Sequence, residues 1–148
     1  MDAHADINTP GSSQSGNFHG MPLSFLTCIA EKLDEYKWIE ETILRPERIV
    51  YIGIRDLDAA EKRILSKKKI KAYWADDVER MGINQIMKET LEFFEKDTPI
   101  HLSFDIDGLD QLEAPSTGTP VRGGLTLREG KYICESLYES GRLIGKTL

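Results

Sequence analysis

The amino-acid sequence predicts an α/β fold with a mostly parallel sheet. Short apolar, β-branched runs, typical of buried strands, alternate along the chain with segments whose apolar residues recur at helical spacing. Strands separated by helices usually pair in parallel, with the helices packed on the faces of the sheet. Because ligands of such sheets gather beyond the carboxyl ends of the strands, the fold class also predicts where a site should lie.

The first part of the chain is expected to hold a loop, a helix and a buried strand. Residues 7–20 are dense in Gly, Ser, Asn and Pro, which is typical of a loop. Residues 21–33 have apolar side chains at helical spacing, and Pro22 falls in the first turn, where proline is tolerated. The apolar run at 48–54 predicts a buried strand.

The alternation continues through the second part. The same patterns predict a helix, a strand and a long helix at 59–66, 71–74 and 78–96. A strand at 100–104 is followed by a loop at 110–125 that is rich in Gly, Pro and Thr. The last helix is expected over 127–141, with Thr126 as its N-cap and Glu129 completing a capping box.

Composition argues against several classes of protein. The chain has 148 residues, which suits a single domain over residues 1–148. No apolar run approaches the roughly 20 residues that span a bilayer. The net charge of −6 argues against a nucleic-acid-binding surface. Cys28 and Cys134 are isolated in helical apolar patterns, so we expect them to be reduced and buried in a cytoplasmic protein, with a mitochondrial origin left open.

Two short acidic motifs point to chemistry. The chain begins with Asp2-Ala3-His4-Ala5-Asp6, and residues 103–110 read Ser-Phe-Asp-Ile-Asp-Gly-Leu-Asp. Charged side chains at i and i+2 point the same way on an extended strand. Like charges crowded on one side repel, and a bound cation relieves that repulsion. Carboxylates with an imidazole suit manganese better than calcium or magnesium, whose sites more often contain only oxygen ligands.

Ordinary explanations without a metal or a substrate also exist. The first motif could be a solvated chain end. In the second motif, Asp105 and Asp107 could cap the turn after the strand, and a turn role is expected for Asp110. Asp58 and Glu61 could be the acidic residues of a helix N-terminus, favoured by the helix dipole, whether or not they contact a substrate. His19 could be a simple loop histidine.

A family resemblance joins these motifs. Behind the second motif stand Ala-Pro-Ser-Thr-Gly-Thr-Pro at 114–120 and Gly-Gly-Leu at 123–125. With both acidic motifs in this order, essentially the whole chain resembles the ureohydrolases, and the arginases in particular. The resemblance implies a partial three-layer α/β/α fold and two Mn²⁺ ions as cofactors. One departure is Gln111, where arginases usually have proline.

The resemblance also implies a metal site and a reaction. Five residues would hold the two ions: Asp2, His4, Asp6, Asp105 and Asp107. Asp2 and Asp105 would bridge the ions, and a hydroxide between the ions would hydrolyse L-arginine to L-ornithine and urea. Asp6 would relay a proton to the leaving amine, and His19 would act as a proton shuttle.

Six residues would contact L-arginine by the same resemblance: Asn8, Ser15, Asn17, Asp58, Glu61 and Thr119. The first three lie in a loop similar to that of arginases and would hydrogen-bond the substrate α-carboxylate. Asp58 would face the α-amino group with Glu61 nearby, and Thr119 would lie near the guanidinium. Since agmatine lacks the carboxylate, such a loop favours arginine.

Measured against the family, segments are expected to be absent at both ends. Upstream these are strands and a second histidine ligand; downstream they are a strand that ends in a glutamate and a tail that helps to assemble the homotrimer. We therefore expect impaired activity in the chain alone. The alternatives are an inactive arginase-like interaction subunit or fragment, associated with longer arginase protomers, and another ureohydrolase such as an agmatinase.

Overall fold

The computed structural model describes residues 1–31, 33–36, 38–39 and 44–147, which divide into two compact units. Unit 1 combines residues 1–3, 50–56 and 72–148, and unit 2 combines residues 4–49 and 57–71. Each unit draws on segments far apart in the sequence. The expectation of a single domain over residues 1–148 stays a prediction.

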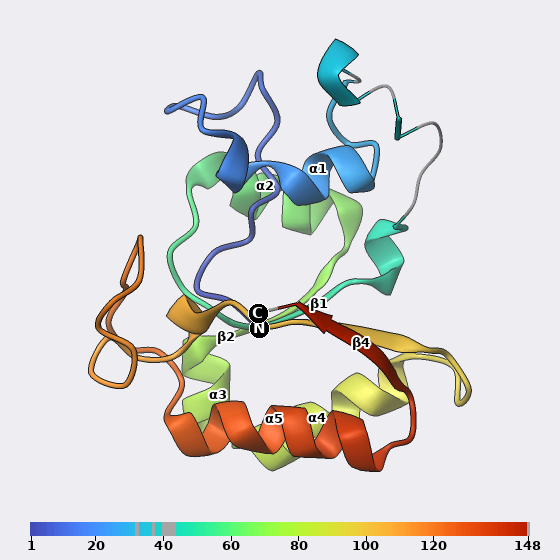
Figure 1. The fold of residues 1–148 in the computed structure, drawn as a ribbon, viewed down its shortest axis with the longest axis vertical. Helices are drawn as coiled ribbons and strands as arrows, with labels where there is room; N and C mark the ends of the chain where they lie inside the picture. Colours follow the sequence, from blue (N-terminus) through green and yellow to red (C-terminus); the bar gives the residue numbers. More distant parts are fainter. Residues whose placement is uncertain (32, 37, 40–43, 148) are drawn as a thin grey trace. The chain divides into compact units, whose positions relative to one another are not determined.

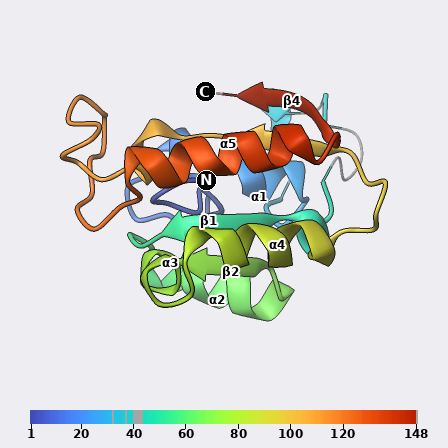
Figure 2. The ribbon, with the colours of Figure 1, turned by 90° about the horizontal axis from the view of Figure 1, so that it is seen from below.

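Unit 1 contains the strands and the longer helices. Its strands are β1 (Val50–Ile54), β2 (Lys71–Trp74, whose first residue belongs to unit 2), β3 (Ile100–Ser103) and β4 (Leu143–Thr147). Its helices are α3 (Ala75–Met81), α4 (Ile83–Phe93), α5 (Leu127–Glu139) and the short 3-10 helix η4 (Ile106–Gly108). β1 pairs with β2, and β3 pairs in parallel with β4. Helices α3, α4 and α5 lie on one side of these strands (Figures 1 and 2).

These parallel strands and helices confirm the α/β class. The expectation of three layers stays a prediction. β4 lies in a region to which the sequence patterns assigned no strand, and its pairing places Ile100 opposite Leu143 and Ser103 opposite Thr147.

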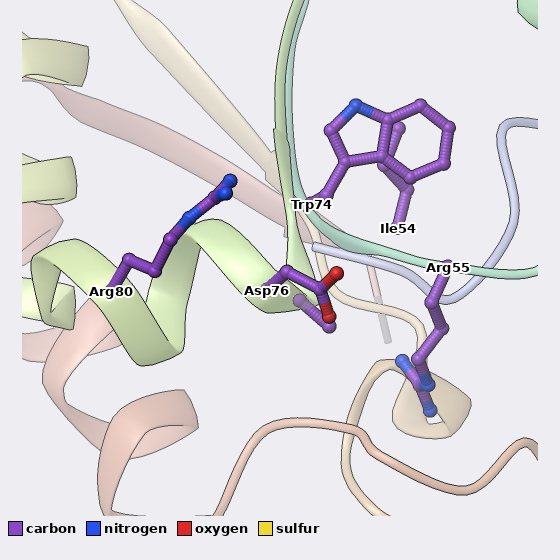
Figure 3. A pocket seen from close by; sticks show the side chains of 6 residues that line it. Ile54, Arg55, Trp74, Asp76 and Arg80 are labelled. Atoms are coloured by element: carbon purple, nitrogen blue, oxygen red, sulfur yellow. The ribbon is translucent and has the colours of Figure 1, made fainter.

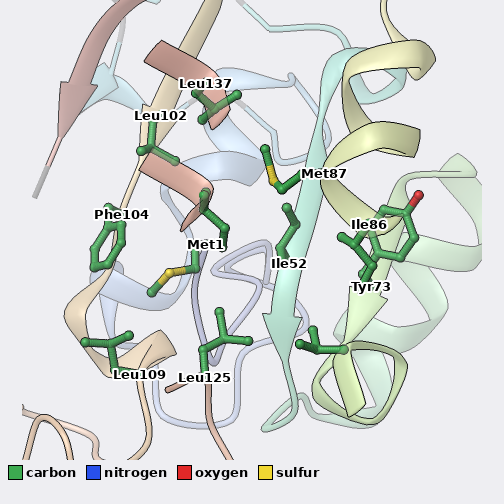
Figure 4. Close-up of a cluster of buried hydrophobic side chains, with 12 residues drawn as sticks. Met1, Ile52, Tyr73, Ile86, Met87, Leu102, Phe104, Leu109, Leu125 and Leu137 are labelled. Atoms are coloured by element: carbon green, nitrogen blue, oxygen red, sulfur yellow. The ribbon is translucent and has the colours of Figure 1, made fainter. Parts of the chain in front are cut away.

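The core of unit 1 lies between the strands and the three helices (Figure 4). Ile52 from β1 and Leu102 from β3 pack with Ile86 and Met87 from α4 and with Leu137 from α5. All five side chains come from segments that the sequence predicted to be strands or helices. Burial of this cluster fixes where the carboxyl ends of β1 and β3 lie within the unit.

The long helix expected over residues 78–96 is wrong as a single element. The chain forms α3 and α4, with Gly82 between them at a φ of +77°. A left-handed residue interrupts the helical hydrogen bonds, and glycine adopts that conformation at little cost. The last helix is confirmed, and Thr126 and Glu129 form the predicted capping box at its start.

Unit 2 is built from short helices. These are η1 (Phe18–Gly20), α1 (Pro22–Leu26), η2 (Asp34–Tyr36), η3 (Pro46–Arg48) and α2 (Ala59–Lys68). A small core of Met21, Phe25, Ala30 and Ile39 holds the first part of the unit together.

The helix predicted over residues 21–33 ends early. α1 stops at Leu26, and Cys28 takes a left-handed φ of +53°. The carbonyl of Ser24 then accepts hydrogen bonds from the N–H groups of both Ile29 and Ala30, so a tight turn replaces further helix. Cys28 is exposed, and the prediction that it is buried is wrong.

In the part of the chain that the structure describes, no helix is long and apolar enough to cross a membrane.

Candidate functional site

The first acidic motif is anchored to the end of β1. The N–H of Asp2 donates to the carbonyl of Ile52 at 3.2 Å. The carbonyl of Ala3 accepts from the N–H groups of Arg55 and Asp56, at 2.9 and 3.0 Å. These bonds place the Asp2 side chain, which is half-buried, at the carboxyl end of a buried strand.

Side chains of this motif alternate as the sequence predicted, although the segment is not a strand. Ala3 and Ala5 are buried, whereas Asp2, His4 and Asp6 are half-buried. His4 and Asp6 belong to unit 2. Asp6 has a φ of +49°, a left-handed conformation that aspartate tolerates better than most residues.

The second acidic motif follows β3 and turns through η4. The N–H of Asp105 donates to the carbonyl of Met1 at 2.9 Å, which joins this motif to the chain segment that carries Asp2. The Asp105 carboxylate accepts from the N–H of Asp107 at 2.9 Å and caps the short helix. The ordinary explanation as a turn cap is therefore also correct for Asp105.

Asp107 is the buried member of the set, with 5% of its surface exposed. Its Oδ1 accepts from the N–H of Ala3 at 3.3 Å, and its Oδ2 accepts from the hydroxyl of Thr119 at 3.1 Å. Asp107 and Asp2 offer carboxylate oxygens within 4.8 Å of each other. Unit 1 thus contains a partial cluster of potential metal ligands, and the predicted substrate residue Thr119 contacts it.

The electrostatics of the cluster favour a cation. Asp105 is exposed by surface area, yet desolvation by the atoms around its carboxylate raises its pKa, opposed by its bond from the Asp107 N–H. The negative charges of Asp2 and Asp107 raise this pKa further. Neighbouring carboxylates repel one another when all are ionised, and a positive ion between them offsets that repulsion. The three aspartates of unit 1 therefore fit a divalent metal by their donor chemistry.

Asp110 has the turn role that the sequence predicted. Its carboxylate accepts from the N–H groups of Leu112, Gly123 and Gly124, at 2.9, 2.7 and 3.0 Å. These bonds lower the pKa of Asp110, and the bond from the Leu112 N–H has the largest effect. Asp110 thereby ties the acidic motif to the Gly-Gly turn behind it.

In unit 2, three of the predicted substrate residues lie together. The Asn8 amide donates from Nδ2 to Oδ2 of Asp58 at 2.7 Å, and its Oδ1 accepts from the hydroxyl of Ser12 at 2.7 Å. Asp58 caps α2, and Glu61 completes the capping box. The predicted role of both acids at a helix N-terminus is confirmed, and their contact with substrate stays a prediction.

Asp58 and Glu61 differ in charge behaviour. Burial raises the pKa of Asp58, but bonds from the N–H groups of Glu61 and Ala60 and from the Asn8 amide outweigh burial, so its pKa is lowered overall. Burial dominates for Glu61 and raises its pKa, although the N–H groups of Asp58 and Ile7 oppose it. Asp58 is thus the better fixed negative charge of the two.

The remaining predicted residues of unit 2 lie along an exposed turn. Ser15, Asn17 and His19 are exposed, and the hydroxyl of Ser15 accepts from the N–H of Asn17 at 3.3 Å. His19 lies in η1. Their side chains are therefore accessible to a ligand from solvent.

A separate cavity of about 330 Å³ lies in unit 1 beside β1 and α3 (Figure 3). It is lined by Ile54, Arg55, Trp74, Ala75, Asp76 and Arg80, and no predicted site residue is among them. Arg55, however, reaches the acidic motif, and its guanidinium donates to the carbonyl of Asp107 at 2.7 Å. Arg55 is not among the residues predicted from the sequence; its signal is a cation placed directly after a buried strand, where the predicted site should lie.

Comparison with known proteins gives a consistent result. A family model described as the arginase family matches residues 1–146. An arginase of Neurospora crassa is 54% identical over 151 residues, covering 100% of this chain and 42% of the relative. The chain spans about half the length of the curated relatives it matches.

Solved structures of arginases resemble this chain too. An arginase from Bacillus caldovelox superimposes with a TM-score of 0.93 at 40% identity, covering 98% of this chain and 49% of the other. An Entamoeba histolytica arginase in complex with L-ornithine gives 0.90 at 36% identity, covering 98% and 49%.

Proposed function

The chain belongs to the arginase family, and from that premise we propose that the protein that carries it hydrolyses L-arginine to L-ornithine and urea with two Mn²⁺ ions. The observation that carries the proposal is the gathering of Asp2, Asp105 and Asp107 at the carboxyl ends of β1 and β3. His4 and Asp6 follow Asp2 in the same motif and would supply the remaining ligands.

The donor set supports manganese. Carboxylates with one imidazole suit Mn²⁺, and the pKa of Asp105 is raised by desolvation and by the negative charges of Asp2 and Asp107, which a bound cation would offset. When bound, such ions lower the pKa of a coordinated water and make it nucleophilic near neutral pH. Thr119, which donates to Asp107, would hold that carboxylate in place and border the substrate guanidinium.

Residues of unit 2 would recognise the amino-acid end of arginine. The lowered pKa of Asp58 favours its negatively charged form, which suits an α-ammonium group. Asn8, Ser15 and Asn17 would donate to the α-carboxylate. Glu61 would act through Asp58, since its carboxylate caps the Asp58 N–H at 3.2 Å.

Proton transfer would fall to Asp6 and His19. Histidine side chains exchange protons near neutral pH, and His19 is exposed, as a shuttle between a site and solvent must be. Asp6, half-buried in the first motif, would pass a proton to the leaving amine. A homotrimer and association with longer arginase protomers stay predictions from the resemblance, and a cytoplasmic location stays a prediction from the isolated cysteines.

The test combines metal binding with turnover. The purified protein would be titrated with Mn²⁺ and followed by electron paramagnetic resonance, with urea release measured on L-arginine and on agmatine. We expect a spin-coupled ion pair that Asp105→Asn abolishes and that the exposed control Asp97→Asn leaves intact. Absence of the pair and of urea would overturn the proposal, and faster release from agmatine would favour an agmatinase instead.

A further inference from the structure

Arg55 lies directly after β1, and its guanidinium holds the backbone of three chain segments. Nη2 donates to the carbonyls of Asp107 and Leu109, at 2.7 and 3.1 Å, and Nη1 donates to that of Gly108 at 3.2 Å. Three successive carbonyls of the second acidic motif therefore face one side chain. Nη1 also donates to its own strand, at the carbonyl of Gly53, at 3.1 Å.

The same guanidinium reaches the turn behind the motif. Nη2 donates to the carbonyl of Val121 at 2.7 Å, and Nε donates to that of Arg122 at 3.2 Å. Gly124 leaves room for this arrangement, because a Cβ there would lie 2.6 Å from Nη2. The acceptors lie up to 67 residues from Arg55 in sequence, so the bonds define tertiary geometry rather than a local turn.

The backbone of Arg55 holds the first acidic motif. Its N–H donates to the carbonyl of Ala3 at 2.9 Å, and the N–H of Ala3 in turn donates to Oδ1 of Asp107 at 3.3 Å. Ala3 stands between Asp2 and His4. One residue thus joins the segment of Asp2, the segment of Asp107 and the turn at Val121.

We propose that Arg55 is a positioning residue for the metal site: by binding the carbonyls of residues 107–109, it sets the direction of the Asp107 carboxylate toward Asp2. This inference rests on the proposed function for its consequence in catalysis, but its geometry is independent of the substrate. Asp107 is the residue through which Arg55 acts.

The chemistry explains why a cation can stand so near a metal site. Each of the six contacts ends on a main-chain carbonyl rather than on a carboxylate, so the guanidinium does not take the oxygens that a metal ion needs. Nη2 carries two hydrogens and has three acceptors, so one of its N–H groups is shared between two carbonyls. Burial lowers the pKa of Arg55, opposed by the charges of Asp107 and Asp110, and an arginine remains cationic under such conditions. Only the planar fork of five N–H donors can serve carbonyls on several sides; a lysine ammonium has three donors at one point.

The experiment compares Arg55→Lys with Arg142→Lys in the purified protein. Arg142 is a matched control, since its guanidinium also donates to three main-chain carbonyls, those of Leu91, Glu95 and Thr98, away from the acidic motifs. The readouts are Mn²⁺ affinity and spin coupling, together with amide hydrogen exchange of Ala3 in the metal-free protein. The exchange rate of Ala3 reports the bond to Asp107 directly.

We expect Arg55→Lys to weaken Mn²⁺ binding by about 10–100-fold, as removal of a residue that orients a ligand does. Exchange at Ala3 should accelerate by about 10-fold. Arg142→Lys should leave both unchanged, even where it lowers stability as much. Unchanged Ala3 exchange and Mn²⁺ affinity in Arg55→Lys would overturn the inference. A protein that responds as expected at Ala3 but releases no urea would contradict the proposed function alone.

Discussion

The acidic segment at residues 105–110 carries predicted metal ligands, and the loop at residues 8–19 carries predicted substrate residues. Each is held within its own unit, and they are held in different ways. The acidic segment is fixed by bonds with residues far away in sequence: Asp105 donates to the carbonyl of Met1, and Asp107 accepts from Ala3 and Arg55. The loop is fixed at its start by Asn8 and Ser12, whereas its later residues are exposed and bonded to near neighbours. Metal ligation requires fixed carboxylates, while recognition of a small substrate can use side chains that face solvent until it binds.

Asp107→Asn should give the largest effect and tests the fixed side of this comparison. Loss of one buried carboxylate removes a proposed ligand and should weaken Mn²⁺ binding by more than ~100-fold, beyond the usual cost of losing a supporting residue. Isothermal titration with Mn²⁺ measures it. The exposed Asp97→Asn should bind as the unsubstituted protein does, and equal affinities in the two variants would remove Asp107 from the site.

Asn17→Ala tests the exposed side. We expect the preference for arginine over agmatine, as the ratio of kcat/KM values, to fall by about 10–100-fold, since a hydrogen bond to a charged carboxylate is lost. Stability should change by less than about 0.5 kcal/mol, because the side chain is exposed. Gln14→Ala in the same loop is the control. A large loss of stability on Asn17→Ala would show that the loop is built more like the acidic segment.

Gly124→Ala should disturb the acidic segment without touching a proposed ligand. The new Cβ would lie 2.6 Å from the N–H nitrogen of Asp110 and from Nη2 of Arg55, so the turn must shift. We expect a loss of about 1–3 kcal/mol in the free energy of unfolding, measured in urea. Gly118→Ala meets no atom within 4 Å and should be nearly neutral; similar losses in both would mean that the close contact is unimportant.

Ser12→Ala tests whether the start of the loop is preorganised. The Ser12 hydroxyl donates to Asn8 at 2.7 Å and accepts from the N–H of Thr9 at 2.8 Å. Its removal should cost about 1 kcal/mol of stability and raise KM for arginine by about 3–10-fold, with little change in kcat. Ser66→Ala, exposed on α2, serves as the control. If kcat falls while KM stays constant, Ser12 affects the reaction rather than the binding of arginine.

The pH dependence should separate two aspartates within the acidic segment. Hydrogen bonds lower the pKa of Asp110 below its ordinary value of 3.8, so its contribution to stability is complete above that value and is lost as pH falls through the folded-state pKa. Asp105, with a raised pKa, acts in the opposite sense: the metal-free protein gains stability as pH falls through that pKa.

Urea midpoints between pH 2 and pH 6 would measure both effects. Asp110→Asn should flatten the loss below about pH 4, and Asp105→Asn should flatten the gain above it. Identical profiles for the two variants would contradict the assignment of opposite shifts.

Local patterns in the sequence were sufficient for several features. The strand before Arg55, the capping box of Thr126 and Glu129, and the acids that begin α2 follow from periodicity and capping chemistry within a few residues. The turn role of Asp110 is also local, since its carboxylate accepts from the N–H of Leu112, two residues away.

Other features depended on contacts that a local pattern does not contain. α1 ends at Leu26, although the apolar spacing continues to Leu33. The carbonyl of Ser24 accepts hydrogen bonds from Ile29 and Ala30, and the resulting turn brings Ala30 into the core. The predicted helix over 78–96 breaks at Gly82, which has a left-handed conformation. A single glycine within a periodic segment does not by itself predict that conformation. Cys28 lies in this turn with a left-handed φ of +53°, and it is exposed.

The sequence by itself determined the α/β class, the two acidic motifs and the residue types suited to a cation, because alternation, spacing and charge are written along the chain. Only the tertiary structure decided that Asp107 is oriented by Ala3 and Thr119, and that Arg55 holds both acidic motifs through main-chain carbonyls. Those acceptors lie more than 50 residues from Arg55, and any residue type offers the same carbonyl, so side-chain identity along the sequence could not reveal them.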